Sequence, residues 1–62
     1  MNDNELRSAL LSFQKRFGTP IIFIAKKCGV SREHLSKWIN IESYLISNEL
    51  KIKIKTVIKS EL

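Results

Sequence analysis

The chain has very little cysteine, proline or glycine: among its 62 residues are one cysteine, one proline and two glycines. A single cysteine, Cys28, excludes an intrachain disulfide framework and suits a reducing compartment such as the cytoplasm. The longest apolar run, Ile21 to Ala25, is too short to cross a bilayer, and the N-terminus lacks the pattern of a signal peptide. The scarcity of glycine and proline also excludes linkers and low-complexity repeats. These absences indicate one small cytoplasmic domain, residues 1–62, with no membrane partner.

Groups that carry chemistry are scarce as well. His34 is the only histidine, so no histidine-based metal cluster is possible, and a lone histidine of this kind is usually structural or solvated. Cys28 is most simply a small buried apolar group. The sequence has no glycine-rich phosphate loop and no pair of nucleophile and base. We therefore expect no metal, no cofactor, no small-molecule ligand and no enzymatic activity.

Charge is the strongest compositional signal. The 11 lysines and arginines exceed the 6 acidic residues, which gives a net charge of +5, while 44% of the residues are hydrophobic. The apolar share predicts a folded domain, although a chain of this length buries only a modest core. The positive charge favours an anionic partner, with nucleic acid first and an acidic membrane surface second. Lysine-rich surfaces also serve solubility alone, so charge does not decide the matter.

The N-terminal segment has the period of an amphipathic helix. One face holds apolar residues at steps of three and four: Leu6, Ala9, Leu10, Phe13 and Phe17. Asn2 is placed to cap this helix with Glu5 as its capping-box partner, and Gly18 is placed to end it. We predict a helix from about Asp3 to Phe17.

Two shorter helices are expected to follow. Thr19 is predicted to cap the first, with Pro20 in its opening position, where no amide donor is needed. The inward residues of that helix would be Ile21, Ile24, Ala25 and Cys28. Gly29 can adopt the positive φ that ends it. Ser31 is placed to cap the second short helix, whose inward residues would be Leu35, Trp38 and Ile39.

The C-terminal segment has two readings. A helix capped by Ser47 would put Leu50, Ile54, Val57 and Ile58 together and leave Ile52 on the far side. A strand, paired in a hairpin with the preceding IESYLI segment, would put Leu50, Ile52, Ile54, Thr56 and Ile58 on one face, with Val57 misplaced. Glu49 near the start and Lys59 near the end suit a helix dipole, and the hairpin would lack a glycine turn. We favour the helix, which predicts an all-α bundle.

The central segment, IAKKCGVSREHLSKWIN, resembles the helix-turn-helix of Cro/cI-type (XRE-like) repressors of phages and mobile elements. The matching positions are Ala25, Gly29, Val30, Ser31, Leu35 and Trp38. The resemblance implies a lambda repressor-like helical bundle and a small transcriptional regulator that binds double-stranded DNA. Two departures stand out. Ile21 occupies a position where many members of the family carry a phosphate-binding glutamine, and the loop from Ile41 to Ile46 is unusually apolar.

The resemblance also implies roles for individual residues. The residues expected to read base edges are Arg32, Glu33, Ser36 and Lys37. Arginine and lysine can donate to guanine, and glutamate can accept from cytosine. The residues expected to contact phosphates are Thr19, Lys26, Lys27, Asn40 and Tyr44. Some of these residues have a simpler alternative: Glu33 can interact favourably with the helix dipole or orient Arg32, Asn40 can be a C-terminal cap, and the lysines can be solvated.

One module reads few base pairs, so we expect a homodimer on a two-fold symmetric site. Its interface candidates are Tyr44, Leu45, Ile46 and Ile52. The alternative function is a protein-interaction module, in which the same fold acts as an inhibitor, anti-repressor or adaptor. The apolar loop and Ile52 favour that alternative, and the basic charge favours DNA.

Overall fold

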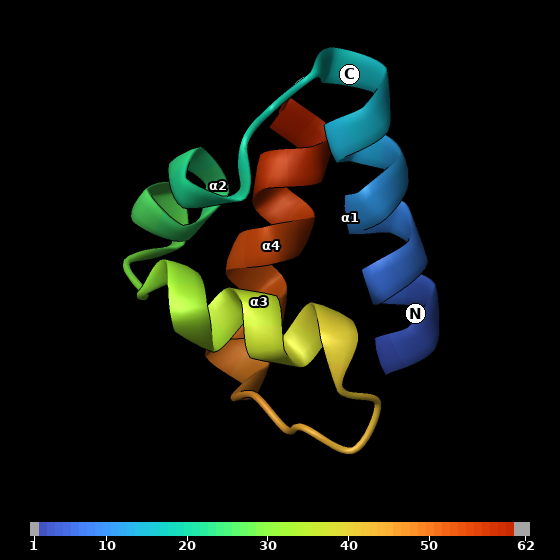
Figure 1. Cartoon of the computed structure of the whole chain (residues 1–62), viewed down its shortest axis with the longest axis vertical. Coiled ribbons are helices and arrows are strands. Elements are labelled where there is room, and N and C mark those ends of the chain that lie inside the picture. Colours follow the sequence, from blue (N-terminus) through green and yellow to red (C-terminus); the bar gives the residue numbers. More distant parts are fainter. Residues whose placement is uncertain (1, 61–62) are drawn as a thin grey trace.

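The structure is a computed structural model that describes residues 2–60. It contains four helices: α1 (Asp3–Phe17), α2 (Ile21–Cys28), α3 (Arg32–Asn40) and α4 (Asn48–Ser60). No strand occurs in this part of the chain, so the predicted all-α bundle is confirmed. In Figure 1, α1 and α4 run along the long axis of the view, α2 lies beside α4, and α3 crosses in front. None of the described helices has the length and apolar character that a bilayer crossing requires.

Both ends of α1 are fixed by its own sequence. The Asn2 side chain accepts a hydrogen bond from the Glu5 amide at 2.8 Å, and the Glu5 carboxylate accepts from the Asn2 amide at 3.1 Å. This pair is the predicted capping box, which satisfies two amides that the helix itself cannot. Gly18 ends the helix with a φ of 64°, a left-handed conformation that costs glycine little. The predicted bounds of α1 are confirmed.

The C-terminal segment is helical, so the strand alternative is wrong. The Ser47 hydroxyl accepts from the Leu50 amide at 3.1 Å, as a helix cap does. Three α4 side chains are buried, Leu50, Ile54 and Val57, while Ile52 is 61% exposed on the other side. A helix buries Val57 with its neighbours, whereas a strand would have turned it away from them. Helix α4 packs against both α1 and α2, and this packing decides between the helix and the strand, which periodicity alone did not.

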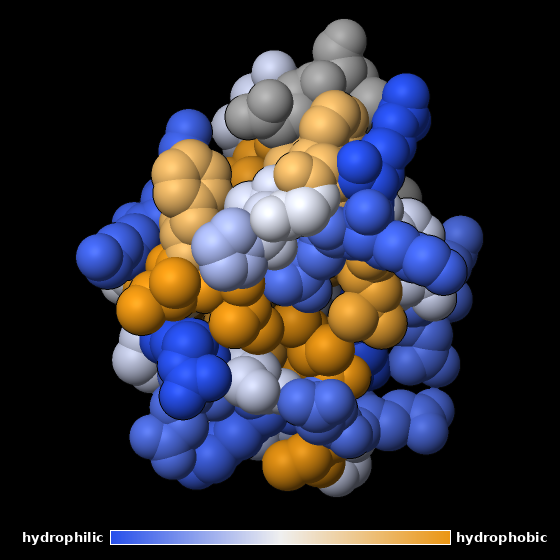
Figure 2. All heavy atoms as spheres, turned by 45° about the horizontal axis from the view of Figure 1, so that its top comes forward, coloured by the Kyte–Doolittle hydropathy of each residue, from blue (hydrophilic) through white to orange (hydrophobic). Residues whose placement is uncertain are grey.

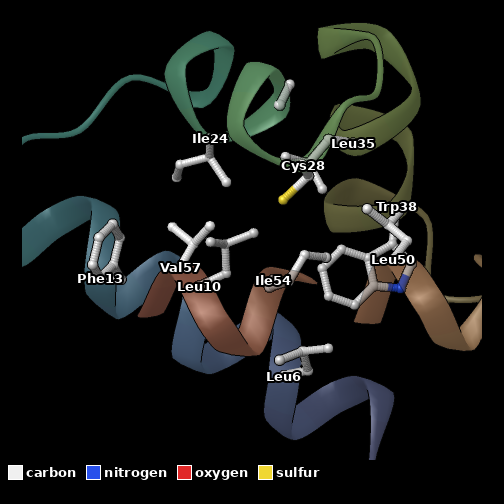
Figure 3. Close-up of a cluster of buried hydrophobic side chains, with 11 residues drawn as sticks. Leu6, Leu10, Phe13, Ile24, Cys28, Leu35, Trp38, Leu50, Ile54 and Val57 are labelled. Carbon is white, nitrogen blue, oxygen red and sulfur yellow. The ribbon is translucent and has the colours of Figure 1, made fainter. Parts of the chain in front are cut away.

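The core draws side chains from all four helices (Figure 3). Its members are Leu6, Leu10, Phe13, Ile24, Ala25, Cys28, Leu35, Trp38, Leu50, Ile54 and Val57. Trp38 is the largest fully buried side chain, and its ring lies at the end of the core formed with Leu50 and Ile54. Burial of a large apolar side chain stabilises a fold by about 1.5 to 3 kcal/mol. The buried residues of α3, Leu35 and Trp38, therefore fix which of its faces points outward.

Candidate nucleic-acid interface

The turn between α2 and α3 is built around Gly29. Its φ of 72° is left-handed, and its amide donates to the carbonyl of Lys26 at 3.2 Å. The next amide, that of Val30, donates to the carbonyl of Ala25 at 3.0 Å. This pair of bonds is a Schellman motif, which satisfies the last carbonyls of α2 and turns the chain sharply. The Val30 side chain packs against the core and holds the turn there.

The start and the inner face of α3 are both fixed. The Ser31 hydroxyl accepts from the His34 amide at 3.1 Å, which confirms Ser31 as the N-cap. Leu35 and Trp38 are both 0% exposed. Together with α2 and the Gly29 turn, α3 forms a helix-turn-helix whose second helix presents its polar residues to solvent.

The four predicted base-reading residues lie on this outer side of α3. Arg32, Glu33 and Lys37 are exposed, and Ser36 is half-buried. The Lys37 ammonium is 3.5 Å from the Glu33 carboxylate, one helical turn away. Glu33 therefore pairs with Lys37 and not with Arg32, and an exposed pair of this kind stabilises a helix by only about 0.3 to 0.5 kcal/mol. A ligand can separate the two charges at little cost.

Asn40 and Ser36 form a second pair on the same side. The Asn40 amide nitrogen donates to the Ser36 carbonyl at 2.9 Å and lies 3.3 Å from its hydroxyl. The residue at the C-terminal cap position is Ile41, whose amide donates to the Lys37 carbonyl. Among residues 2–60, the Arg32 side chain makes no hydrogen bond or ion pair. Arg32 is thus the base-reading candidate whose donors are all available to a partner.

The predicted N-cap of α2 is wrong by one residue. Pro20 occupies the cap position in an extended conformation, with φ −69° and ψ 148°, and α2 begins at Ile21. The fixed φ of proline suits this position, and the Pro20 carbonyl accepts from the Phe23 amide at 3.1 Å. Thr19 is half-buried, and its carbonyl accepts a hydrogen bond from the Gln14 side chain at 3.2 Å. No side chain caps the start of α2, so the Thr19 hydroxyl has no capping role.

The other predicted phosphate contacts of α2 are exposed. Lys26 and Lys27 lie in its last turn, and the Lys27 ammonium lies 5.2 Å from the centre of the Phe23 ring. No described acidic residue forms an ion pair with either lysine. Both cations remain available to an anionic partner, as the prediction requires.

The α3–α4 loop is held against α3 by a contact that the sequence did not suggest. The Tyr44 hydroxyl lies 2.7 Å from His34 Nδ1, and the two rings meet edge to face. Both residues are half-buried, and with Ser31, Glu33 and Lys37 they line an open polar hollow. His34 therefore joins the loop to α3, and the hydroxyl of Tyr44 lies beside that helix.

Arg7 holds the backbone of the same loop from α1, a role that sequence reasoning missed. Its Nε donates to the Trp38 carbonyl, and its Nη2 lies within 3.2 Å of three further carbonyls, those of Ile41, Glu42 and Tyr44. Its guanidinium also stacks on the Trp38 ring at 5.0 Å. The available signal was its spacing on α1, where Arg7 lies three residues before the core residue Leu10 and so on the same side of the helix.

The predicted dimer residues divide into two groups. Leu45 is 80% exposed and Ile52 is 61% exposed, so both offer apolar surface to a partner. Tyr44 and Ile46 are half-buried and pack against the core of their own chain. The exposed pair therefore fits an interface better than the half-buried pair.

Two ionisable groups away from α3 have shifted pKa values. The pKa of Asp3 is lowered, chiefly by its 2.8 Å contact with Lys51 and further by the charge of Arg7. Burial raises the pKa of the Cys28 thiol, which is enclosed in the core. Neither group adjoins the outer side of α3.

No group of histidine, cysteine and acidic residues within the described range could hold a metal ion. Comparison with protein-family models, curated proteins and solved structures finds no match to this chain.

Proposed function

We propose that the protein is a sequence-specific double-stranded DNA-binding regulator that inserts α3 into the major groove, in the manner of the Cro/cI-type repressors that its sequence resembles. The observation that carries this proposal is the division of α3. Its inner residues are buried in the core, and its outer residues form a polar row that follows a hydrogen-bonded turn. Such a helix can meet base edges without rearrangement of the fold. The net charge of +5 supports an anionic partner.

Within this proposal the outer residues of α3 have different roles. Arg32 donates to a guanine, because its guanidinium has no competing partner among the described residues. Glu33 and Lys37 exchange their mutual contact for contacts with base edges, and Ser36 with Asn40 forms an edge of the interface. Lys26 and Lys27 contribute the non-specific phosphate attraction.

We infer that the active form is a homodimer. One α3 reads too few base pairs for a unique site, and a two-fold axis doubles the site. Leu45 and Ile52 are the exposed apolar residues that a second copy would cover. A charged side chain at Leu45, as in Leu45→Lys, is expected to weaken dimer formation in analytical ultracentrifugation while leaving the helical content unchanged.

The test of sequence-specific binding is selection of bound duplexes from random DNA, followed by affinity measurements on the selected site. Arg32→Ala is expected to lower the preference for that site over a random duplex by about 5- to 150-fold, the loss of one bidentate base contact. Arg16→Ala is the matched control, because it removes the same side chain from the end of α1. Equal discrimination by both variants would remove Arg32 from the interface.

The alternative is a protein-interaction module, which is favoured by a different observation. At the end of the molecule where α1 runs into α2, the exposed apolar side chains are Phe17, Ile22 and Phe23. When that end is turned forward, apolar atoms reach the surface between hydrophilic side chains (Figure 2). A failure to select any duplex, with Ile22→Lys abolishing capture of a protein partner, would establish this alternative instead.

A further inference from the structure

The hydrogen bond between His34 and Tyr44 can run in either direction. The Tyr44 oxygen and His34 Nδ1 are 2.7 Å apart, so one hydrogen lies between them. A neutral imidazole can leave Nδ1 without a hydrogen, and the Tyr44 hydroxyl then donates to it. A protonated imidazole carries hydrogens on both nitrogens, and Nδ1 must then donate to the tyrosine oxygen. In that state the hydroxyl hydrogen of Tyr44 is free to donate elsewhere.

The surroundings keep the two groups together in either state. The Tyr44 carbonyl accepts from Arg7 at 3.2 Å, which ties the loop to α1. The other ionisable groups that line the hollow are Glu33 and Lys37, whose charges are 3.5 Å apart and largely offset each other in the free protein. Protonation of His34 therefore changes the direction of one hydrogen bond and adds one charge.

We propose that His34 is a positioning residue that sets whether the Tyr44 hydroxyl can donate to a DNA phosphate. This inference rests on the proposed function, because it requires Tyr44 to meet the DNA backbone beside α3. A phosphate oxygen accepts but does not donate, so the hydrogen between His34 and Tyr44 must come from Nδ1 when Tyr44 donates to a phosphate. A protonated His34 already carries that hydrogen, whereas a neutral His34 must first move its hydrogen from Nε2 to Nδ1. Protonation of His34 therefore favours the phosphate contact.

The sign of the pH dependence follows from this linkage. The protonated form of His34 is the tighter binder, so the affinity for DNA rises as the pH falls from 8.0 to 5.5. The gain corresponds to one hydrogen bond and amounts to about fivefold in affinity. The added charge on His34 would also attract DNA, so a control must separate charge from hydrogen-bond direction.

Tyr44→Phe provides that control, because it keeps the ring and the titratable His34 but removes the hydroxyl. The measurement is fluorescence anisotropy on the selected duplex at pH 5.5 and 8.0, at fixed ionic strength. The wild-type protein is expected to bind about fivefold more tightly at pH 5.5 than at pH 8.0. For Tyr44→Phe and for His34→Gln, the affinities at the two pH values are expected to differ by less than about twofold. A fivefold gain that persists in Tyr44→Phe would mean that charge alone is responsible, and would overturn the inference.

Two further outcomes separate this inference from the proposed function. Duplex binding without any pH dependence overturns the role of His34 and leaves the proposed function intact. Absence of duplex binding at both pH values overturns the proposed function and the inference with it. In the free protein, nitrogen NMR at pH 8.0 is expected to find Nδ1 of His34 without a hydrogen. A hydrogen on Nδ1 at that pH would contradict the proposal independently of DNA.

Discussion

Replacement of Arg7 by alanine is expected to be the most damaging single polar substitution in the protein. The side chain is only 7% exposed, and its guanidinium is the contact that ties α1 to the end of α3 and to the following loop. Without it, the Trp38 carbonyl and the loop carbonyls lose a common donor. The loop that carries Tyr44 would then be tied to the helices mainly through its own side chains.

The magnitude follows from the number of available hydrogens. Nη2 carries two hydrogens for its three carbonyl acceptors, and Nε carries one for Trp38, so three full bonds to the backbone are possible. Hydrogen bonds from a charged donor contribute about 1.5 to 3 kcal/mol each. The cost of burying the guanidinium offsets much of that sum, and water can reach the exposed loop carbonyls in the variant. We expect a net loss of about 3 kcal/mol.

Urea unfolding followed by Trp38 fluorescence measures this loss. A chain of this length has a total stability of about 3 to 9 kcal/mol, so a loss of about 3 kcal/mol leaves Arg7→Ala with about 0 to 6 kcal/mol at 25 °C. Arg7→Lys is the informative companion, because it keeps the charge but lacks the planar fork, and is expected to lose about half as much. A loss below about 1 kcal/mol in Arg7→Ala would refute the reasoning, because the guanidinium would then contribute too little net stability to hold the loop.

Three further predictions concern single features of the fold. Asp3→Asn is expected to lower the urea midpoint at pH 7. Because folding lowers the pKa of Asp3 below its ordinary value of 3.8, the difference in midpoint between the two proteins should vanish as the pH falls through and below the folded-state pKa. A difference that persists at that low pH would contradict a contribution from the Asp3 charge. Gly29→Ala is expected to lower the free energy of unfolding by about 1 to 2 kcal/mol through backbone strain alone, since nothing lies within 4 Å of the added carbon. Gly29→Asn is expected to lower it less, because asparagine tolerates the left-handed conformation better than alanine; equal losses in the two variants would argue against strain. Cys28 is expected to react with a thiol reagent only through unfolding, at a rate that rises with urea; rapid labelling of the native protein would contradict its burial.

The local features of the fold could be predicted from the sequence because their partners are close in the chain. The capping box of Asn2 and Glu5, the left-handed Gly29 and the Ser31 cap each depend on residues within four positions. The α4 segment was harder, because its apolar residues fit two periods almost equally well. Burial of Leu50, Ile54 and Val57 against α1 and α2 decided it, and that packing exists only in the folded chain.

Two features of the candidate interface could not be predicted, for a related reason. The acceptors of Arg7 are backbone carbonyls 31 to 37 residues away, and carbonyls leave no pattern in a sequence. The contact between His34 and Tyr44 joins a helix to a loop ten residues on, and each residue alone has a more ordinary interpretation. The outer side of α3 was predictable, because the buried positions Leu35 and Trp38 define it by exclusion.

The central proposal is that the outer side of α3 binds duplex DNA, and a salt titration tests it most directly. Anisotropy of a labelled duplex, titrated with the wild-type protein between 50 and 200 mM salt, reports the number of phosphates that the protein neutralises. We predict that the logarithm of the affinity falls linearly with the logarithm of the salt concentration, by about 0.9 per phosphate, and that Lys26→Ala makes this slope shallower. An affinity that is absent, or that does not change with salt, would contradict DNA binding by this protein.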